Sequence, residues 1–167
     1  MIVEEVQVLL ARYRSLGILV DTNILLLYVV GLVNRDRIPR FKRTQQFIPE
    51  DFDLLTQILR SFQTIVTTPN ILTEVNSLAN QLGEPERSRC FHLFSQAIAN
   101  LQETYETSAL LAQSPEFPRI GLTDCSILSA ARDRYLVLTD DLQLAAQLQS
   151  QNIDTINFNN IRPLGWP

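Results

Sequence analysis

Two short apolar runs that each end in acidic residues constrain the fold of this chain most strongly. Ile18–Val20 is followed at once by Asp21, and Tyr135–Leu138 runs into Thr139–Asp141. Such runs are typical of strands buried on both faces of a parallel sheet. The carboxyl ends of parallel strands meet at one edge, where ligands bind in open α/β sheets. We therefore expect Asp21 and Asp141 to lie at the same edge of a sheet.

The rest of the chain alternates between strand and helix patterns. Ile65–Val66 predicts a short central strand, which leads into a helix that Thr68 caps and Pro69 opens. Further helical patterns lie at about 87–104, 122–133 and 142–148, a break lies at 114–118, and a late strand is expected at 153–158. This alternation predicts an α/β fold with a mostly parallel central sheet.

The length of the chain favours a single domain, expected to span residues 1–167. A chain of this size buries roughly two-thirds of its surface on folding, and 46% hydrophobic residues can supply the core. Residues 1–16 are expected to add an amino-terminal helix that packs on the surface through Val6, Leu9 and Leu10. Trp166 is expected either to pack the tail or to contact a partner.

The charge of the chain does not favour nucleic-acid binding as a whole, because the net charge is −4. Binding of RNA would need a local basic patch. The densest one is Arg35, Arg37, Arg40, Lys42 and Arg43. Phosphate binding and an ordinary solvated loop are equally good interpretations of this basic segment.

Cysteine usage and hydropathy favour a cytoplasmic protein without a membrane anchor. Cys90 and Cys125 are expected to be packing residues, since neither has a thiol or histidine at metal-ligand spacing. The start of the chain carries Glu4 and Glu5, unlike a secretory signal. The apolar stretch 24–33 is about half the roughly 20 residues that span a bilayer.

Two further acids lie on predicted helices. On a helical wheel Asp124 falls among Ile127 and Leu128, so its carboxylate is expected to point inward and to need a cation, a cap or several donors. Glu74 falls at the margin of its apolar face, where it can open onto a groove.

Each acid also has an ordinary structural interpretation. Asp124, Asp140 and Asp141 lie where helix N-caps are expected, Asp21 can serve a turn, and Glu74 can be a solvated helix residue. Carboxylates about 4 Å apart repel by roughly 4 kcal/mol at an effective dielectric constant of 20, so a cluster of them needs protons or a counter-ion. Oxygen ligands favour Mg²⁺ or Mn²⁺ over Zn²⁺, and the only histidine, His92, is expected on a helix face.

The ordered set of motifs resembles the PIN-domain family over about residues 17–158. The motifs are Ile18-Leu19-Val20-Asp21-Thr22-Asn23, Glu74 on a helix, Leu122-Thr123-Asp124, and Leu138-Thr139-Asp140-Asp141. The resemblance implies a three-layer α/β/α fold and a Mg²⁺- or Mn²⁺-dependent endoribonuclease that leaves 5′-phosphate and 3′-hydroxyl ends.

The resemblance also implies roles for individual residues. Asp21, Asp124 and Asp141 would hold the metal directly or through water, and Glu74 would complete the acidic pocket as a further catalytic and metal-site residue. Asn23 and Thr139 match positions that orient the site.

Several biological roles stay open at this stage. RNA is the expected substrate, and a toxin-type nuclease would pair with an antitoxin-like protein, but the amino-terminal helix and the basic segment depart from a compact toxin. A housekeeping nuclease is nearly as well supported, and a homodimer is compatible with the apolar helix faces. The alternative is an inactive PIN-like scaffold that binds RNA or protein, and a nuclease of DNA flaps is less favoured.

Overall fold

The computed structural model describes residues 2–164, so the expected role of Trp166 lies outside the described residues. These residues form an α/β fold around one sheet of five parallel strands in the order β3-β2-β1-β4-β5. The strands are β1 (Ile18–Val20), β2 (Ile65–Thr67), β3 (Gln102–Glu103), β4 (Leu136–Thr139) and β5 (Thr155–Asn157). The predicted class and the parallel sheet are confirmed, with β1 rather than β2 at the centre.

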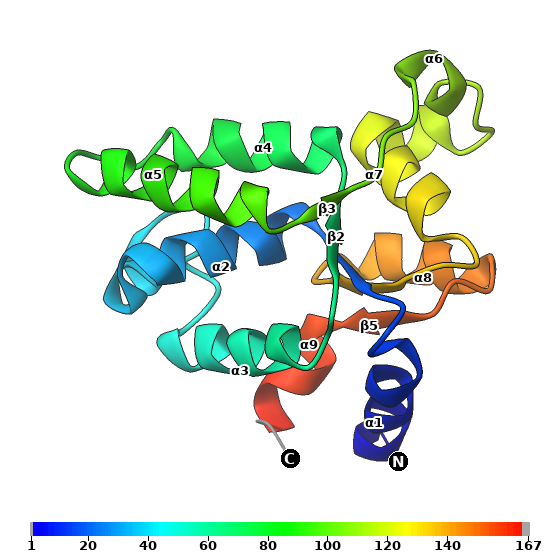
Figure 1. Cartoon of the computed structure of the whole chain (residues 1–167), viewed down its shortest axis with the longest axis horizontal. Coiled ribbons are helices and arrows are strands. Elements are labelled where there is room, and N and C mark those ends of the chain that lie inside the picture. The colour runs from blue at the N-terminus through cyan, green and yellow to red at the C-terminus, as the bar shows by residue number, and fades with distance from the viewer. Residues whose placement is uncertain (1, 165–167) are drawn as a thin grey trace.

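Helices cover both faces of this sheet. They are α1 (Ile2–Tyr13), α2 (Thr22–Val33), α3 (Pro49–Arg60), α4 (Pro69–Ala79), α5 (Glu86–Ala99), α6 (Ser108–Leu111), α7 (Phe117–Ala131), α8 (Leu142–Ser150) and α9 (Phe158–Ile161), with 3₁₀ helices η1 (Arg35–Arg40) and η2 (Arg162–Leu164). Figure 1 shows α2 to α5 gathered on one side of the strands and α7 and α8 on the other, which is a three-layer arrangement. Within residues 2–164, no helix combines the length and the apolar character needed to cross a bilayer.

Strand β1 forms the centre of the core because its side chains are apolar on both faces. Leu19 is paired with Val66 of β2 and Val137 of β4, and all three side chains are fully buried. Just beyond β1, the amide of Asp21 donates to the carbonyl oxygen of Leu138 over 3.0 Å. This hydrogen bond fixes the ends of β1 and β4 side by side.

Helix α2 is apolar almost all round because other helices surround it. It contacts α3, α4 and α5 as well as β4, and buried residues run along its length from Ile24 to Gly31. Gly31 is required by a close approach of α3, since a Cβ atom there would lie 2.1 Å from Cδ2 of Phe52. The ring of Tyr28 stacks on the same phenylalanine.

The prediction of a helix at about 87–104 is wrong at the carboxyl end. Helix α5 stops at Ala99, where the amide of Asn100 donates to the carbonyl oxygens of Ala97 and Ile98. The following residues Gln102–Glu103 pair with Val66–Thr67 as edge strand β3.

The helix predicted at 122–133 begins earlier than expected, at Phe117. A backbone break at Gly121, with φ at 79°, divides α7 and makes the predicted segment a nearly separate helix. Such a positive φ is unstrained in glycine, which has no Cβ.

Candidate acidic site

Asp21 is held at the end of β1 by two hydrogen bonds. It is 7% exposed and caps α2, and its Oδ1 accepts from the amide of Thr22 over 2.6 Å. Its Oδ2 accepts from the Thr139 hydroxyl at the end of β4, also over 2.6 Å. The predicted orienting role of Thr139 therefore has a direct geometric basis in the positioning of Asp21.

Asp141 follows β4 and caps α8, as its N-cap interpretation predicted. Its Oδ1 accepts from the amides of Gln143 and Leu144, while its own amide donates to the Thr139 hydroxyl oxygen over 3.0 Å. One hydroxyl thus connects the two strand-end acids. Capping uses Oδ1 of Asp141, and Oδ2 accepts no hydrogen bond from the described residues.

Asp140 does not cap a helix, so that prediction is wrong. Its Oδ2 accepts from the side-chain Nδ2 of Asn23 over 3.4 Å, and the side chain of Asn159 donates to its backbone carbonyl over 2.9 Å. Its Oδ1 is buried without a hydrogen-bond partner among residues 2–164. Asn23, predicted to orient the site, therefore lies against Asp140.

Glu74 is exposed, yet its carboxylate is anchored from both sides. Oε2 accepts from the Thr22 hydroxyl over 3.1 Å, and Oε1 accepts from the Thr123 hydroxyl over 2.7 Å. The contacts come from α2 and α7, so Glu74 of α4 lies between them.

Asp124 lies on α7 just beyond the break at Gly121 and is half-buried. Its side chain makes no hydrogen bond to the part of the chain that the structure describes, so the predicted cap is not formed. Burial, together with the charges of Asp21, Asp141 and Glu74, raises the pKa of Asp124 to about 7.

The pKa of Asp21 is also raised, to about 6. Burial is the main cause, and Asp140 and Asp141 add repulsion, while the hydrogen bonds from Thr139 and Thr22 oppose the rise. Burial likewise raises the pKa of Asp140. The structure therefore brings the predicted acids Asp21, Glu74, Asp124 and Asp141 into one electrostatic cluster at the carboxyl edge of the sheet.

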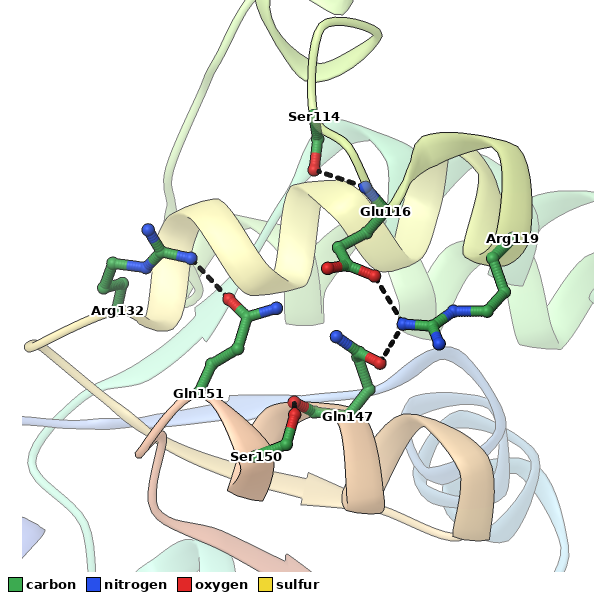
Figure 2. Close-up of polar contacts among 7 residues, drawn as sticks. All are labelled: Ser114, Glu116, Arg119, Arg132, Gln147, Ser150 and Gln151. Atoms are coloured by element: carbon green, nitrogen blue, oxygen red, sulfur yellow. Dashed lines mark hydrogen bonds and ion pairs between the residues drawn. The ribbon is translucent and has the colours of Figure 1, made fainter.

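Polar bridges join α7 to α8 (Figure 2). The guanidinium of Arg119 donates to both Glu116 and Gln147, and Arg132 donates to Gln151 over 2.6 Å. The Arg119 bridge lies before the break at Gly121, and the Arg132 bridge lies at the end of the segment that carries Asp124. The helix of Asp124 is therefore joined at its carboxyl end to α8, which Asp141 caps.

The acidic cluster has the chemistry of a site for a hard divalent cation, although its side chains do not converge on one point. Within residues 2–164, no three His, Cys, Asp or Glu side chains are arranged to hold a metal ion together. Asp21 and Glu74 turn their oxygens onto protein donors instead, as mutual repulsion favours. The all-oxygen donor set of Asp21, Glu74, Asp124 and Asp141 nevertheless fits Mg²⁺ or Mn²⁺.

The basic segment lies away from this cluster. It follows α2, whose 12 residues carry the chain about 18 Å from Asp21. Arg35 forms an ion pair with Asp53, and Arg37 forms one with Glu86. Part of the positive charge of the basic segment is therefore neutralised within the protein. Among the other three predicted RNA-binding residues, Arg43 donates to Gln81 and Arg40 to a backbone carbonyl, and the remaining one is the exposed Lys42.

Two residues that hold the site were missed from the sequence, Thr22 and Thr123. Each stands beside a predicted acid in the chain, Thr22 after Asp21 and Thr123 before Asp124. That adjacency was the available signal, but both hydroxyls donate to Glu74 on α4, which is 52 residues from Thr22 and 49 from Thr123.

Comparisons of the chain with protein-family models and with curated proteins found no match.

Proposed function

We propose that this chain is a divalent-metal-dependent endoribonuclease of PIN-like type. The observation that carries the proposal is the gathering of Asp21, Glu74, Asp124 and Asp141 at the carboxyl edge of a parallel sheet. Their mutual repulsion, which contributes to the raised pKa values of Asp21 and Asp124, would be relieved by a positive counter-charge or by protons. The resemblance of the motifs supplies the choice of RNA as substrate.

Three residues are the best candidates to hold the ion. Asp124 has a carboxylate without hydrogen bonds to the described residues, Asp141 has a free Oδ2, and Asp21 keeps lone pairs beside its two donors. When bound, a divalent cation would lower the pKa of water for attack and neutralise charge on the phosphoryl oxygens.

The protein's own part in the reaction is to position the acidic side chains. Thr139 and the amide of Thr22 keep the Asp21 carboxylate in one orientation, and Thr22 and Thr123 do the same for Glu74. Fixed acceptors of this kind lower the cost of organising the site at the moment of reaction. Glu74, exposed at the rim, would orient a water or a ribose hydroxyl.

A second candidate is a binding module without catalysis. The hydrogen bonds that Asp21, Glu74 and Asp141 make to protein donors favour it, because these acids already hold strands and helices together. In this role the cluster would be a structural feature of an RNA- or protein-binding scaffold.

A cleavage assay separates the two candidates. Single-stranded and structured RNAs are incubated with Mn²⁺, Mg²⁺ or chelator, and the product ends are mapped for wild type, Asp21→Asn and Asp124→Asn. The nuclease predicts metal-dependent products with 5′-phosphates that both variants lose. RNA binding without turnover in either metal would support the scaffold, and undiminished cleavage by a variant that carries both substitutions would refute the site.

A further inference from the structure

A polar pocket lies beside the acidic cluster, in the crevice between α4 and α7. Its volume is about 270 Å³, and the residues that matter for its chemistry are Asn70, Tyr105, Glu106, Ser129 and Arg134. The pocket begins about one helical turn from the cluster, because Asn70 and Glu74 are four residues apart on α4.

The wall of the pocket is rigid. The hydroxyls of Thr68 and Ser126, both nearly fully buried, lie 2.9 Å apart across the two helices. Ser126 donates to the carbonyl oxygen of Thr123, and Thr68 accepts from the amide of Ile71. Thr68 therefore donates to Ser126, and these two groups are satisfied within the protein. The Glu74 to Thr123 contact joins the same helices one turn further on.

The mouth of the pocket, in contrast, presents polar side chains that are accessible to a ligand. Within residues 2–164 the side chains of Asn70, Ser129 and Arg134 make no hydrogen bond or ion pair. Tyr105 lines the pocket and is 72% exposed, so its ring is accessible to a ligand. An amide, a hydroxyl, a guanidinium and a free aromatic face thus converge on one hollow.

A larger hollow of about 580 Å³ shares Glu106 and Ser129 with this pocket. Three of its other polar residues are already paired: Arg132 with Gln151, and Glu116 with Arg119. Figure 2 shows the Arg132–Gln151 bond between the ends of α7 and α8 and the Glu116–Arg119 pair at the start of α7. A ligand that reached these residues would have to replace their contacts.

We infer that the α4–α7 pocket receives one unpaired nucleobase of an RNA strand whose backbone passes the acidic cluster. A base stacks on an exposed aromatic ring, and its edge bonds to an amide and a hydroxyl, as in recognition of single-stranded RNA. The guanidinium of Arg134 meets a phosphate. The inference rests on the proposed function for its choice of RNA.

The pocket also selects among bases. The Glu106 carboxylate, which already accepts from the amide of Thr107, can only accept further hydrogen bonds. It therefore favours a base with an exocyclic amino group, such as adenine, cytosine or guanine, over uracil, whose one donor on that edge, N3–H, lies between two carbonyl oxygens that repel a carboxylate. The Asn70 amide offers a donor and an acceptor to the same edge.

Binding without cleavage tests the pocket directly. Labelled oligo-A, oligo-C and oligo-U of about eight nucleotides are titrated with protein in chelator, and anisotropy gives the dissociation constants. We expect oligo-A and oligo-C to bind more tightly than oligo-U, and Tyr105→Ala to weaken binding of all three about tenfold. Glu106→Gln should reduce the discrimination against uracil.

Asn76→Ala is the matched control for Asn70→Ala, since both asparagines lie on α4 and Asn76 is exposed and outside the pocket. Wild-type affinity in Asn70→Ala and Tyr105→Ala, or no base preference in the wild type, would overturn the inference. If the wild type cleaves RNA in a metal-dependent way and the pocket variants bind RNA as the wild type does, the proposed nuclease stands and the pocket inference is wrong. If RNA binding depends on the pocket but no metal supports cleavage, the pocket inference stands and the proposed nuclease is wrong.

Discussion

The Thr139 hydroxyl donates to Oδ2 of Asp21 over 2.6 Å and accepts from the amide of Asp141 over 3.0 Å. These two contacts connect the ends of β1 and β4 through one fully buried side chain. One hydroxyl therefore contributes to the placement of both strand-end acids.

Thr139→Val removes this hydroxyl while keeping the shape of the side chain. Because the bond from Thr139 lowers the pKa of Asp21 from what burial alone would give, its loss should raise that pKa above about 6. The rise of metal-dependent activity with pH should then shift to higher pH, and unfolding free energy should fall by about 1–3 kcal/mol. Thr139→Ser should restore both; a pH profile unchanged in the valine variant would contradict the positioning role.

Asp124 should make the metal-free protein less stable as the pH rises. Its pKa is raised from 3.8 to about 7, so the folded state binds the proton more tightly than the unfolded state. The associated stability is present below pH 4 and is lost between about pH 4 and 7. In the presence of chelator, the Tm of the wild type should fall as the pH rises across this window, and the Tm of Asp124→Asn should fall less. An equal fall in the wild type and the variant would argue against the burial of an ionised carboxylate at Asp124.

The basic segment offers a test of electrostatic binding. Arg40, Lys42 and Arg43 have no acidic partner among the described residues, whereas Arg35 pairs with Asp53. Replacing the first three by glutamine should weaken RNA binding and flatten its dependence on salt, because fewer counterions are released. Arg35→Gln is the control that should change salt dependence less. Binding isotherms at several salt concentrations that coincide for wild type and triple variant would exclude the segment from the interface.

Gly31→Ala tests the packing of α2 on α3. A Cβ atom at this position would lie 2.1 Å from Phe52, so the ring must move, and the unfolding free energy should fall by about 1–3 kcal/mol. Gly83→Ala is the matched control, because nothing lies within 4 Å of its Cβ position. Denaturant titrations that give the same midpoint for both variants would contradict the observed contact between the helices.

The sequence predicted the strand-end part of the site well, since an acid that follows a buried parallel strand is placed by the sheet itself. Asp21 and Asp141 are examples, and Thr139 lies between the two strand ends as expected. The helical acids could be predicted only as positions on a helix face. Their partners Thr22 and Thr123 depend on how α2, α4 and α7 pack, which no local pattern encodes.

The fold was predictable where the apolar pattern was strong. Strand β3 was missed because Gln102–Glu103 is short, polar and exposed at the sheet edge, so it carries no strand pattern of its own. Helix α3 was missed although its apolar residues Leu54, Leu55 and Ile58 are buried. The basic segment before it contains proline and was interpreted as a possible solvated loop, and no helix was predicted after it.

The most direct test of the account is a titration of the protein with Mn²⁺, with free Mn²⁺ followed by electron paramagnetic resonance. The account predicts saturable binding to the wild type that Asp21→Asn together with Asp124→Asn abolishes, while both proteins keep the same circular dichroism spectrum. Mn²⁺ binding of equal affinity in the wild type and the double variant, or none in the folded wild type, would contradict a metal site at the acidic cluster.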